Sequence, residues 1–446
     1  MPDRRLLIGL IVLAMAARVS AVVVLRSHEV PHSTYEHGEI AANLLNGRGF
    51  SVQFLGADGP TSQQAPAYPW LVAGAYWLGG EGTPRALLIL ELGQALLGGF
   101  LVLFIAILAS EVAPGRPRVA SLACLIVAVH PTLVYSATHV QVASLAATLL
   151  AGSMAWAYRA GRTGSSRLAV TGGFFLGLLV LSDPILGLVA PGMVWAIGQG
   201  QGWRRASRLI ALLGISAGLC VAPWVVRNIR VHGEFVPIKS SFGYAFWQGN
   251  CALSEGTDKV VRSSAEAKLS RSSNSLRDLN TTLWEARHKA GYIDDIALTP
   301  ADYRELGSVS EPERSRKLFQ RALADLRAEP GRYARLCLRR LRYFVFFDET
   351  NPKTRSPIYR VSHLALTILA GLGLILARPD VRGRLGPTLL TAVLIASFHA
   401  LTIVSARFHL PIEPLMALWA ATGVSRWSPS TPTADDVEGV GVVARL

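Results

Sequence analysis

Long apolar runs, repeated along most of the chain, constrain the fold of this sequence more than any other feature. They lie near residues 6–25, 86–109, 119–135, 138–157, 168–182, 184–199, 209–226, 357–377, 387–405 and 409–425. A transmembrane helix needs about 20 mostly apolar residues, so the sequence predicts an all-α polytopic membrane protein with about ten transmembrane helices. The composition agrees, because only 17% of the residues are charged, against roughly 25% in ordinary soluble domains.

Arginine residues occupy every second short connection between these runs. They are Arg4, Arg5, Arg116, Arg118, Arg159, Arg162, Arg167, Arg204, Arg205, Arg208, Arg378, Arg382, Arg384 and Arg426. Cytoplasmic loops of membrane proteins carry an excess of Lys and Arg, so we expect these connections to face the cytoplasm. The two long connections, 26–85 and 227–356, then face outward. Much of the formal net charge of +14 therefore reports topology and not a nucleic-acid partner.

The apolar runs divide the chain into four parts. These are a transmembrane core (1–227) that contains the first outward loop (26–85), an external region (228–356), C-terminal transmembrane helices (357–425) and a cytoplasmic tail (426–446). We expect amphipathic interfacial helices in the first outward loop and a small, mainly helical external region.

The external region has a soluble composition. Its segment 312–348 has apolar residues at helical spacing, and Glu329-Pro330-Gly331 divides it into two helices. The segment 252–300 is rich in Ser and Asn, and we expect it to be a loop. Cys251 and Cys337 both lie outside the apolar runs, and the sequence leaves open whether they pair.

The first outward loop contains a short amphipathic segment with acidic side chains. Glu36, Glu39 and Asn43 share one helical face, apolar residues such as Ile40 share another, and Gly47 stops the helix. Such a helix would lie at the membrane surface and place carboxylates where a lipid headgroup sits. The alternative is a plain surface helix with solvated acids.

Three of the ten histidines fall in the same stretch, as His28, His32 and His37. Together with nearby glutamates they offer the imidazole and carboxylate ligands that suit a zinc or manganese ion. However, Pro31 breaks the helix that would align His28 with His32. The sequence therefore favours a solvated segment and predicts no cofactor, with a divalent metal at these histidines as the alternative.

Several motifs of the chain resemble those of GT-C glycosyltransferases, and more narrowly of bacterial family-39-like enzymes related to protein mannosyltransferases and aminoarabinose transferases. The similar stretches are Tyr35–Ser51, Gly59-Pro60-Thr61, Pro66-Ala67-Tyr68-Pro69, Pro223–Asn228 with Gly233–Pro237 and Gly249-Asn250, Pro330–Phe347 and Ala406–Pro414. They occur in the order expected for that family and cover most of the chain.

The resemblance implies an inverting enzyme that takes a sugar from a polyprenyl-phosphate carrier. It implies an acceptor (a glycan, a lipid or a protein) on the outer face of the bacterial cytoplasmic membrane. The family's loop carboxylate falls at Glu36, where many relatives carry Asp. A single displacement at the anomeric carbon needs a base for the acceptor's proton, and a carboxylate can serve.

Such a reaction also needs positive charge near the departing lipid phosphate, and Arg is suited to phosphate. Arg407, Arg227 and Arg48 lie on the same predicted side as Glu36, and snorkelling at a helix end is the alternative for Arg407 and Arg227. Weaker substrate-binding candidates are Tyr68, Glu39 and Asp183.

Two other functional classes stay open at the level of sequence. A transporter or flippase of lipid-linked sugars would place charges at the membrane midplane between inverted repeats, whereas here the charges gather at the predicted outer surface and no convincing repeat is visible. A catalytically inactive scaffold of the same family is the third possibility.

Overall fold

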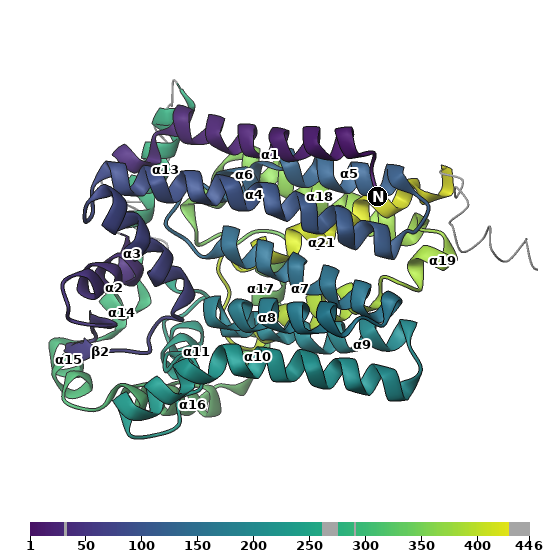
Figure 1. Ribbon diagram of the computed structural model, residues 1–446. Helices are drawn as coiled ribbons and strands as arrows, with labels where there is room; N and C mark the ends of the chain where they lie inside the picture. Colours follow the sequence, from purple (N-terminus) through teal and green to yellow (C-terminus); the bar gives the residue numbers. More distant parts are fainter. Residues whose placement is uncertain (31–33, 261–274, 290, 428–446) are drawn as a thin grey trace, which may run out of the picture.

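The computed structural model describes residues 1–30, 34–260, 275–289 and 291–427. Helices dominate this part of the chain and most of them run along one common direction (Figure 1). Four are long and apolar enough to cross a membrane: α1 (Arg4–Leu25), α4 (Pro84–Val112), α10 (Trp203–His232) and α18 (Pro357–Leu376). The protein is thus a multi-pass, α-helical membrane protein, and the expected count of about ten spans is not confirmed.

The remaining apolar runs form shorter helices. They are α5 (Pro117–Val129), α6 (Pro131–Ser136), α7 (Ala143–Thr163), α8 (Ser166–Ser182), η2 (Pro184–Val189), α9 (Ala190–Gly200), α20 (Gly386–Leu401), η4 (Leu410–Ile412), α21 (Glu413–Thr422) and η5 (Gly423–Trp427). The prediction of a single span at 119–135 is wrong, because this run is divided into α5 and α6. The runs 184–199 and 409–425 are each helical without a gap, as η2–α9 and as η4–α21–η5. Pro131, Pro184 and Pro411 each stand in the first turn of a new helix, where a fixed φ and a missing N–H are tolerated.

The connections separate into two ends of the molecule. In Figure 1 the N-terminus and α19 (Pro379–Arg382) lie at the right-hand end, and the first long loop lies at the left-hand end. At the right-hand end Glu111, Arg116, Arg162 and Arg384 line one cavity of about 1020 Å³. The arginine-bearing connections thus meet at one end, as the alternation along the sequence predicts.

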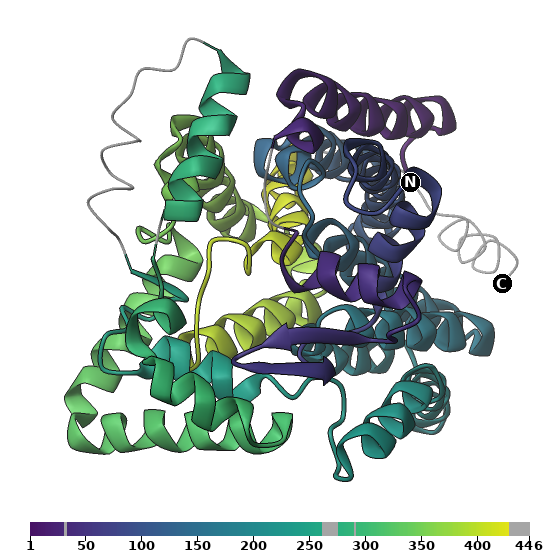
Figure 2. The same cartoon turned by 90° about the vertical axis from the view of Figure 1, so that its left-hand side faces the viewer.

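The first long loop contains η1 (Ser27–Glu29), α2 (Tyr35–Leu45), β1 (Ser51–Phe54), β2 (Ala57–Pro60) and α3 (Ala67–Gly79). The amphipathic prediction for α2 is confirmed, since Ile40 is fully buried and Glu39 is exposed. The two strands form an antiparallel hairpin, visible at the front of Figure 2. Leu55 and Gly56 both have positive φ in its turn, which is the geometry of a two-residue hairpin.

The external region packs beside this loop (Figure 2). It contains α11 (Phe242–Asn250), a two-residue ladder of β3 (Lys259–Val260) with β4 (Gly291–Tyr292), α13 (Leu276–Lys289), α14 (Ile293–Ala297), α15 (Pro300–Gly307), α16 (Glu311–Ala328), α17 (Pro330–Val345) and η3 (Pro352–Arg355). The division of the last long helix at Glu329-Pro330 is confirmed.

Two expectations for the external region are corrected by the structure. The segment 252–300 is not wholly loop, because α13 and α14 form where Leu283, Trp284 and Ile293 are buried. Burial against neighbouring elements outweighs the weak helical preference of the Ser- and Asn-rich sequence. Cys251 and Cys337 are both free thiols. The predicted tail lies outside the described residues beyond Trp427.

Candidate functional site

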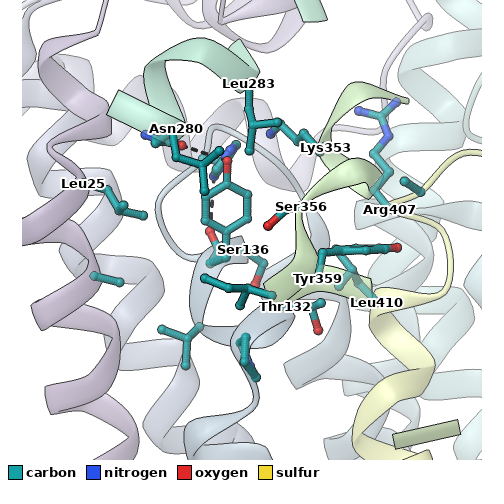
Figure 3. A pocket seen from close by; sticks show the side chains of 18 of the residues that line it. Leu25, Thr132, Ser136, Asn280, Leu283, Lys353, Ser356, Tyr359, Arg407 and Leu410 are labelled. Atoms are coloured by element: carbon teal, nitrogen blue, oxygen red, sulfur yellow. Dashed lines mark hydrogen bonds between the residues drawn. The ribbon is translucent and has the colours of Figure 1, made fainter. Parts of the chain in front are cut away.

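An apolar groove of about 410 Å³ opens between α1, α6, α13 and α18 (Figure 3). Leu25 of α1 and Leu283 of α13 lie on facing sides, and Tyr359 of α18 lies along its wall. Cations come from Lys353 and Arg407, which also line the groove. The groove is therefore apolar along its length and positive at its edge.

Arg407 is the cation that the surrounding chain leaves most accessible. Its side chain is exposed, and it forms no ion pair with the described residues. The nearest aromatic ring is that of its neighbour Phe408, 5.6 Å from the guanidinium carbon. Lys353 differs, because its ammonium group lies over the rings of Trp284 and Tyr135, at 4.4 and 5.2 Å.

Arg407 also belongs to a group of charged side chains that we name the Lys239 cluster: Glu36, Asp183, Lys239 and Arg407. Burial lowers the pKa of Lys239, and the charges of Asp183 and Glu36 raise it again in part. Its Nζ donates to Oε1 of Gln64 at 3.2 Å. The cluster joins the start of α2, the end of α8, the segment after α10 and the segment before η4.

Three members of this cluster are residues that the sequence singled out, and Lys239 is not. A signal for it exists in the sequence: all six lysines of this arginine-rich chain lie within residues 239–353. A compact ammonium on a flexible stem differs from a guanidinium in geometry and in the ease with which its pKa shifts. The confinement of all lysines to residues 239–353 is therefore the one sequence feature that could have pointed to a lysine in this region.

Glu36 occupies the first turn of α2, next to a residue of unusual backbone conformation. Tyr35 has φ of 54°, in the left-handed region that non-glycine residues seldom adopt. Gly38 follows, and a Cβ there would lie 1.6 Å from Oγ1 of Thr34. The start of α2 is thus tightly constrained at the point where it presents Glu36.

His37 packs on the opposite side of this turn against Tyr68, with ring centroids 5.0 Å apart. Burial lowers the pKa of His37 to about 3, and the charges of Lys239 and Arg407 act in the same direction. The imidazole is therefore neutral at physiological pH. Tyr68 is itself fully buried and donates to Oε1 of Gln94 at 3.0 Å, so it supports α2 from the protein interior.

Arg227 serves as a clamp between α10 and the first long loop. Its guanidinium donates to the carbonyl oxygens of Thr61 and Phe50, at 2.6 and 2.9 Å. It also lies over the ring of Trp224, at 4.8 Å. These contacts occupy the planar fork that a phosphate would need.

Arg48 and Glu39 are engaged with the hairpin. Arg48 pairs with Asp58 at 2.9 Å, and both side chains are exposed. Glu39 accepts from the backbone N–H of Gln53 at 2.6 Å. No contact in the described part of the chain joins either residue to the Lys239 cluster, and their predicted roles in substrate binding stay untested.

The histidines of the first long loop do not gather. Nδ1 of His28 lies 2.8 Å from a carboxylate oxygen of Glu91 in α4, while His37 packs against Tyr68 and His32 lies outside the described residues. Among the described residues, a grouping with metal-ligand chemistry occurs elsewhere, at His363, His409 and Glu413.

Comparison with known proteins gives a result for the fold only. No family model matches the chain, and no curated protein matches it. An oligosaccharyltransferase of Archaeoglobus fulgidus, tethered to an acceptor peptide with an NVT sequon, matches with a TM-score of 0.55 and 13% identity. The match covers 95% of this chain and 50% of that protein.

Two further structures are similar. The Archaeoglobus fulgidus oligosaccharyltransferase AglB, in complex with an inhibitory peptide and a dolichol-phosphate, has a TM-score of 0.54 and 14% identity, over 98% of this chain and 54% of AglB. ArnT of Cupriavidus metallidurans, bound to undecaprenyl phosphate, has 15% identity over 94% of this chain and 78% of ArnT, at a TM-score of 0.41 that is too low to support an argument. The chain spans about half the length of the oligosaccharyltransferases it matches, and over that length it shares their fold.

Proposed function

We propose that the protein is an inverting glycosyltransferase that moves a sugar from a polyprenyl-phosphate carrier to an acceptor at the outer face of a bacterial cytoplasmic membrane. The observation that supports this most is the position of Arg407. It lines the apolar groove and also acts electrostatically on Lys239, which is in turn influenced by Glu36. A lipid phosphate held at Arg407 would have its apolar chain in the groove and its sugar toward a carboxylate.

In the proposed reaction an acceptor oxygen attacks the anomeric carbon as the bond from that carbon to the phosphate oxygen breaks. Glu36 takes the acceptor's proton, and the polyprenyl phosphate departs with the bonding electrons. Arg407 and Lys239 stabilise the negative charge on the departing phosphate. The dolichol-phosphate bound to AglB supports a lipid phosphate as the ligand of this fold. The acceptor is a glycan, a lipid or a protein, and no nucleic acid takes part.

The first test replaces the proposed base. Glu36→Gln keeps the size of the side chain and removes its basicity, so turnover with donor and acceptor should fall by about 10²- to 10⁴-fold while donor binding is kept. Glu313→Gln is the matched control, since Glu313 is an exposed acid on α16, away from the Lys239 cluster. Turnover within a factor of about two of wild type in Glu36→Gln would exclude Glu36 as the base.

The second test replaces the proposed phosphate ligand. Hydrogen bonds to charged groups contribute about 1.5–3 kcal/mol, so Arg407→Ala should weaken donor binding by about 10- to 100-fold. Arg316→Ala is the control, because Arg316 pairs with Glu234 at the surface of the external region. Equal donor affinity in wild type and Arg407→Ala would show that Arg407 does not bind the donor and only contacts lipid headgroups.

The same assay separates catalysis from transport. A transporter or flippase moves the lipid-linked sugar and leaves the sugar–phosphate bond intact, whereas the proposed enzyme releases free polyprenyl phosphate. Mass spectrometry of the lipid products from reconstituted vesicles distinguishes the two outcomes. Release of polyprenyl phosphate that depends on both the acceptor and Glu36 would support the enzyme.

A further inference from the structure

Three histidines surround one buried carboxylate at the junction of α5, α18 and α21, next to Thr132 and Tyr359 of the groove. Nδ1 of His409 and Nδ1 of His363 lie 3.2 and 3.3 Å from Oε1 of Glu413. Nε2 of His130 lies 3.7 Å from Oε2 of the same residue. Glu413 is fully buried, and the exposed fractions of the three histidines are 6% or less.

The tautomer of His363 makes this arrangement difficult without a cation. Nε2 of His363 faces the carbonyl oxygen of Val345 at 3.0 Å, and a carbonyl only accepts, so this nitrogen carries the proton. In the neutral ring Nδ1 then has a lone pair, which points at the carboxylate oxygen of Glu413. Two acceptors 3.3 Å apart in a buried site require a second proton or a metal ion between them.

His409 offers a second ligand beside His363. Its Nδ1 lies 3.2 Å from the same oxygen of Glu413. Ligands about 2.1 Å from a tetrahedral ion lie about 3.4 Å apart, which is close to the observed 3.2 and 3.3 Å. The ligand atoms of His363, His409 and Glu413 all lie within 4.8 Å of one another, whereas Nε2 of His130 faces the other carboxylate oxygen and is not part of this group.

The outer atoms of these side chains have the partners that metal ligands need. Oε2 of Glu413 accepts from the hydroxyl of Thr132, and Nε2 of His409 lies 2.7 Å from the hydroxyl of Tyr359. Such second partners set the tautomer and orientation of a ligand. Each of His363, His409 and Glu413 has one, since Nε2 of His363 donates to the carbonyl oxygen of Val345.

We propose that His363, His409 and Glu413 bind a divalent metal ion, with Zn²⁺ as the preferred ion. Two imidazoles and one carboxylate suit Zn²⁺. The ion joins α18 to the start of α21, and through Thr132 and Tyr359 it holds two residues that line the groove.

Metal analysis of the protein tests this proposal without reference to activity. The full chain, purified in detergent through a tag that contains no histidine, should contain about one equivalent of zinc. His363→Ala and His409→Ala should each lose it. His28→Ala is the matched control, because His28 pairs with Glu91 and belongs to the other histidine group. Metal retained in folded His363→Ala, or lost equally in His28→Ala, would overturn the assignment.

Two measurements keep the proposal testable if the alanine variants do not fold. Replacement of zinc by Co²⁺ in the wild-type chain should give the intense visible bands of a tetrahedral site. Tyr359→Phe removes one outer hydroxyl only, so it should fold and bind zinc about 10- to 100-fold more weakly. Wild-type protein free of metal as purified, and with no gain in thermal stability when Zn²⁺ is added, would show that protons satisfy this cluster instead.

Discussion

Lys239 shows how one buried side chain can organise charges that come from distant parts of the sequence. The negative charges of Asp183 and Glu36 raise the pKa of Lys239, and the positive charge of Arg407 lowers it. Among the described residues, the only direct hydrogen-bond partner of Lys239 is Gln64. Burial lowers the pKa of Lys239, while the charges of Asp183 and Glu36 favour its charged form. When it is charged, Lys239 adds a second positive charge to the cluster that contains Arg407.

Replacement of Lys239 should separate donor binding from the chemical step. In Lys239→Met the stem is kept and the charge is lost, so we expect donor affinity and turnover both to fall, by about 10-fold or more each. Lys317→Met is the control, because Lys317 pairs with Glu305 on the outer surface of the external region. Isothermal titration with the donor and a transfer assay give the two values. Wild-type behaviour in both would exclude Lys239 from the site.

Asp348 is a titratable group that holds the backbone next to Arg407. Its carboxylate accepts from the backbone N–H of Ala406 at 3.2 Å and from Thr350. Burial raises the pKa of Asp348 to about 6, from a usual value of 3.8. Between pH 3.8 and about 6 the folded protein therefore holds a proton that the unfolded chain has lost. This bound proton stabilises the folded state; the stabilisation is complete below pH 3.8 and disappears as pH rises through about 6.

We predict that the protein loses stability as pH rises from 3.8 to about 6, and that Asp348→Asn removes this loss. The amide cannot ionise, so the variant should lack a decrease of up to about 3 kcal/mol in unfolding free energy over this range. The midpoint of thermal denaturation, measured as a function of pH, is the readout. Asp302→Asn is the control. The hydroxyl and the backbone N–H of Thr299 donate to the Asp302 carboxylate and lower its pKa to about 2, outside this range. An unchanged pH profile in Asp348→Asn would contradict the assignment.

The residue types of the candidate site were partly visible in the sequence. Glu36, Asp183 and Arg407 stand out because an acid or a cation interrupts an apolar context, and the charges of all three act on Lys239. Lys239 did not stand out, and His409 and Glu413 appeared only as part of the Ala406–Pro414 stretch, with no role of their own. Their meaning comes from contacts between residues as much as 283 positions apart, from His130 to Glu413, which no local pattern contains.

At the scale of elements, Arg18 shows why a charge can be stabilising inside a span. The break between α5 and α6 leaves carbonyl oxygens at the end of α5 without partners. Arg18 of α1 is buried and donates to the carbonyls of Val127 and Ala128, at 3.3 and 3.2 Å. One side chain of α1 thus satisfies the end of α5.

Removal of this cap should destabilise the helix bundle. Arg18→Met fills similar space and leaves buried carbonyls unsatisfied, at a cost of about 1–3 kcal/mol each. The thermal midpoint of the purified variant should fall, whereas Arg26→Met, at the exposed end of α1, should behave as wild type. A midpoint for Arg18→Met equal to that of wild type would mean that water or lipid satisfies these groups.

Prolines account for the main difference between predicted and observed elements. Hydropathy measures the length of an apolar run and does not detect a break inside it, so the run from 119 to 135 reads as one helix. Pro131 begins α6, and α5 ends at Val129. The break is tolerated in an apolar environment because Arg18 donates hydrogen bonds to the carbonyl oxygens that it leaves free. The amphipathic helix α2 and the pair α16–α17 were predictable, because their patterns are local.

At the scale of the whole molecule, the groove forms only where several distant segments of the chain pack together. Its lining comes from α1, α6, α13, η3, α18 and the segment before η4. Three of these elements, α1, α6 and α18, lie in apolar runs that sequence patterns locate, but their neighbours in space are set by packing between distant helices. The predicted fold class could therefore be obtained from sequence, while the site required the three-dimensional arrangement.

Filling the groove should block the donor and leave the protein folded. Ala21 lines the groove from α1, while Val23 lies on the same helix with 62% of its surface exposed. Ala21→Phe places a ring where the polyprenyl chain is proposed to lie, so donor affinity should fall by about 10-fold or more, since loss of each buried CH₂ contact contributes about 0.8 kcal/mol. Val23→Phe adds the same ring on the exposed face and should bind the donor normally. If both variants keep the wild-type thermal midpoint and wild-type affinity, the lipid chain lies elsewhere and the groove has another use. A selective loss in Ala21→Phe, with long-chain donors more affected than short-chain donors, would place the carrier lipid between α1 and α13.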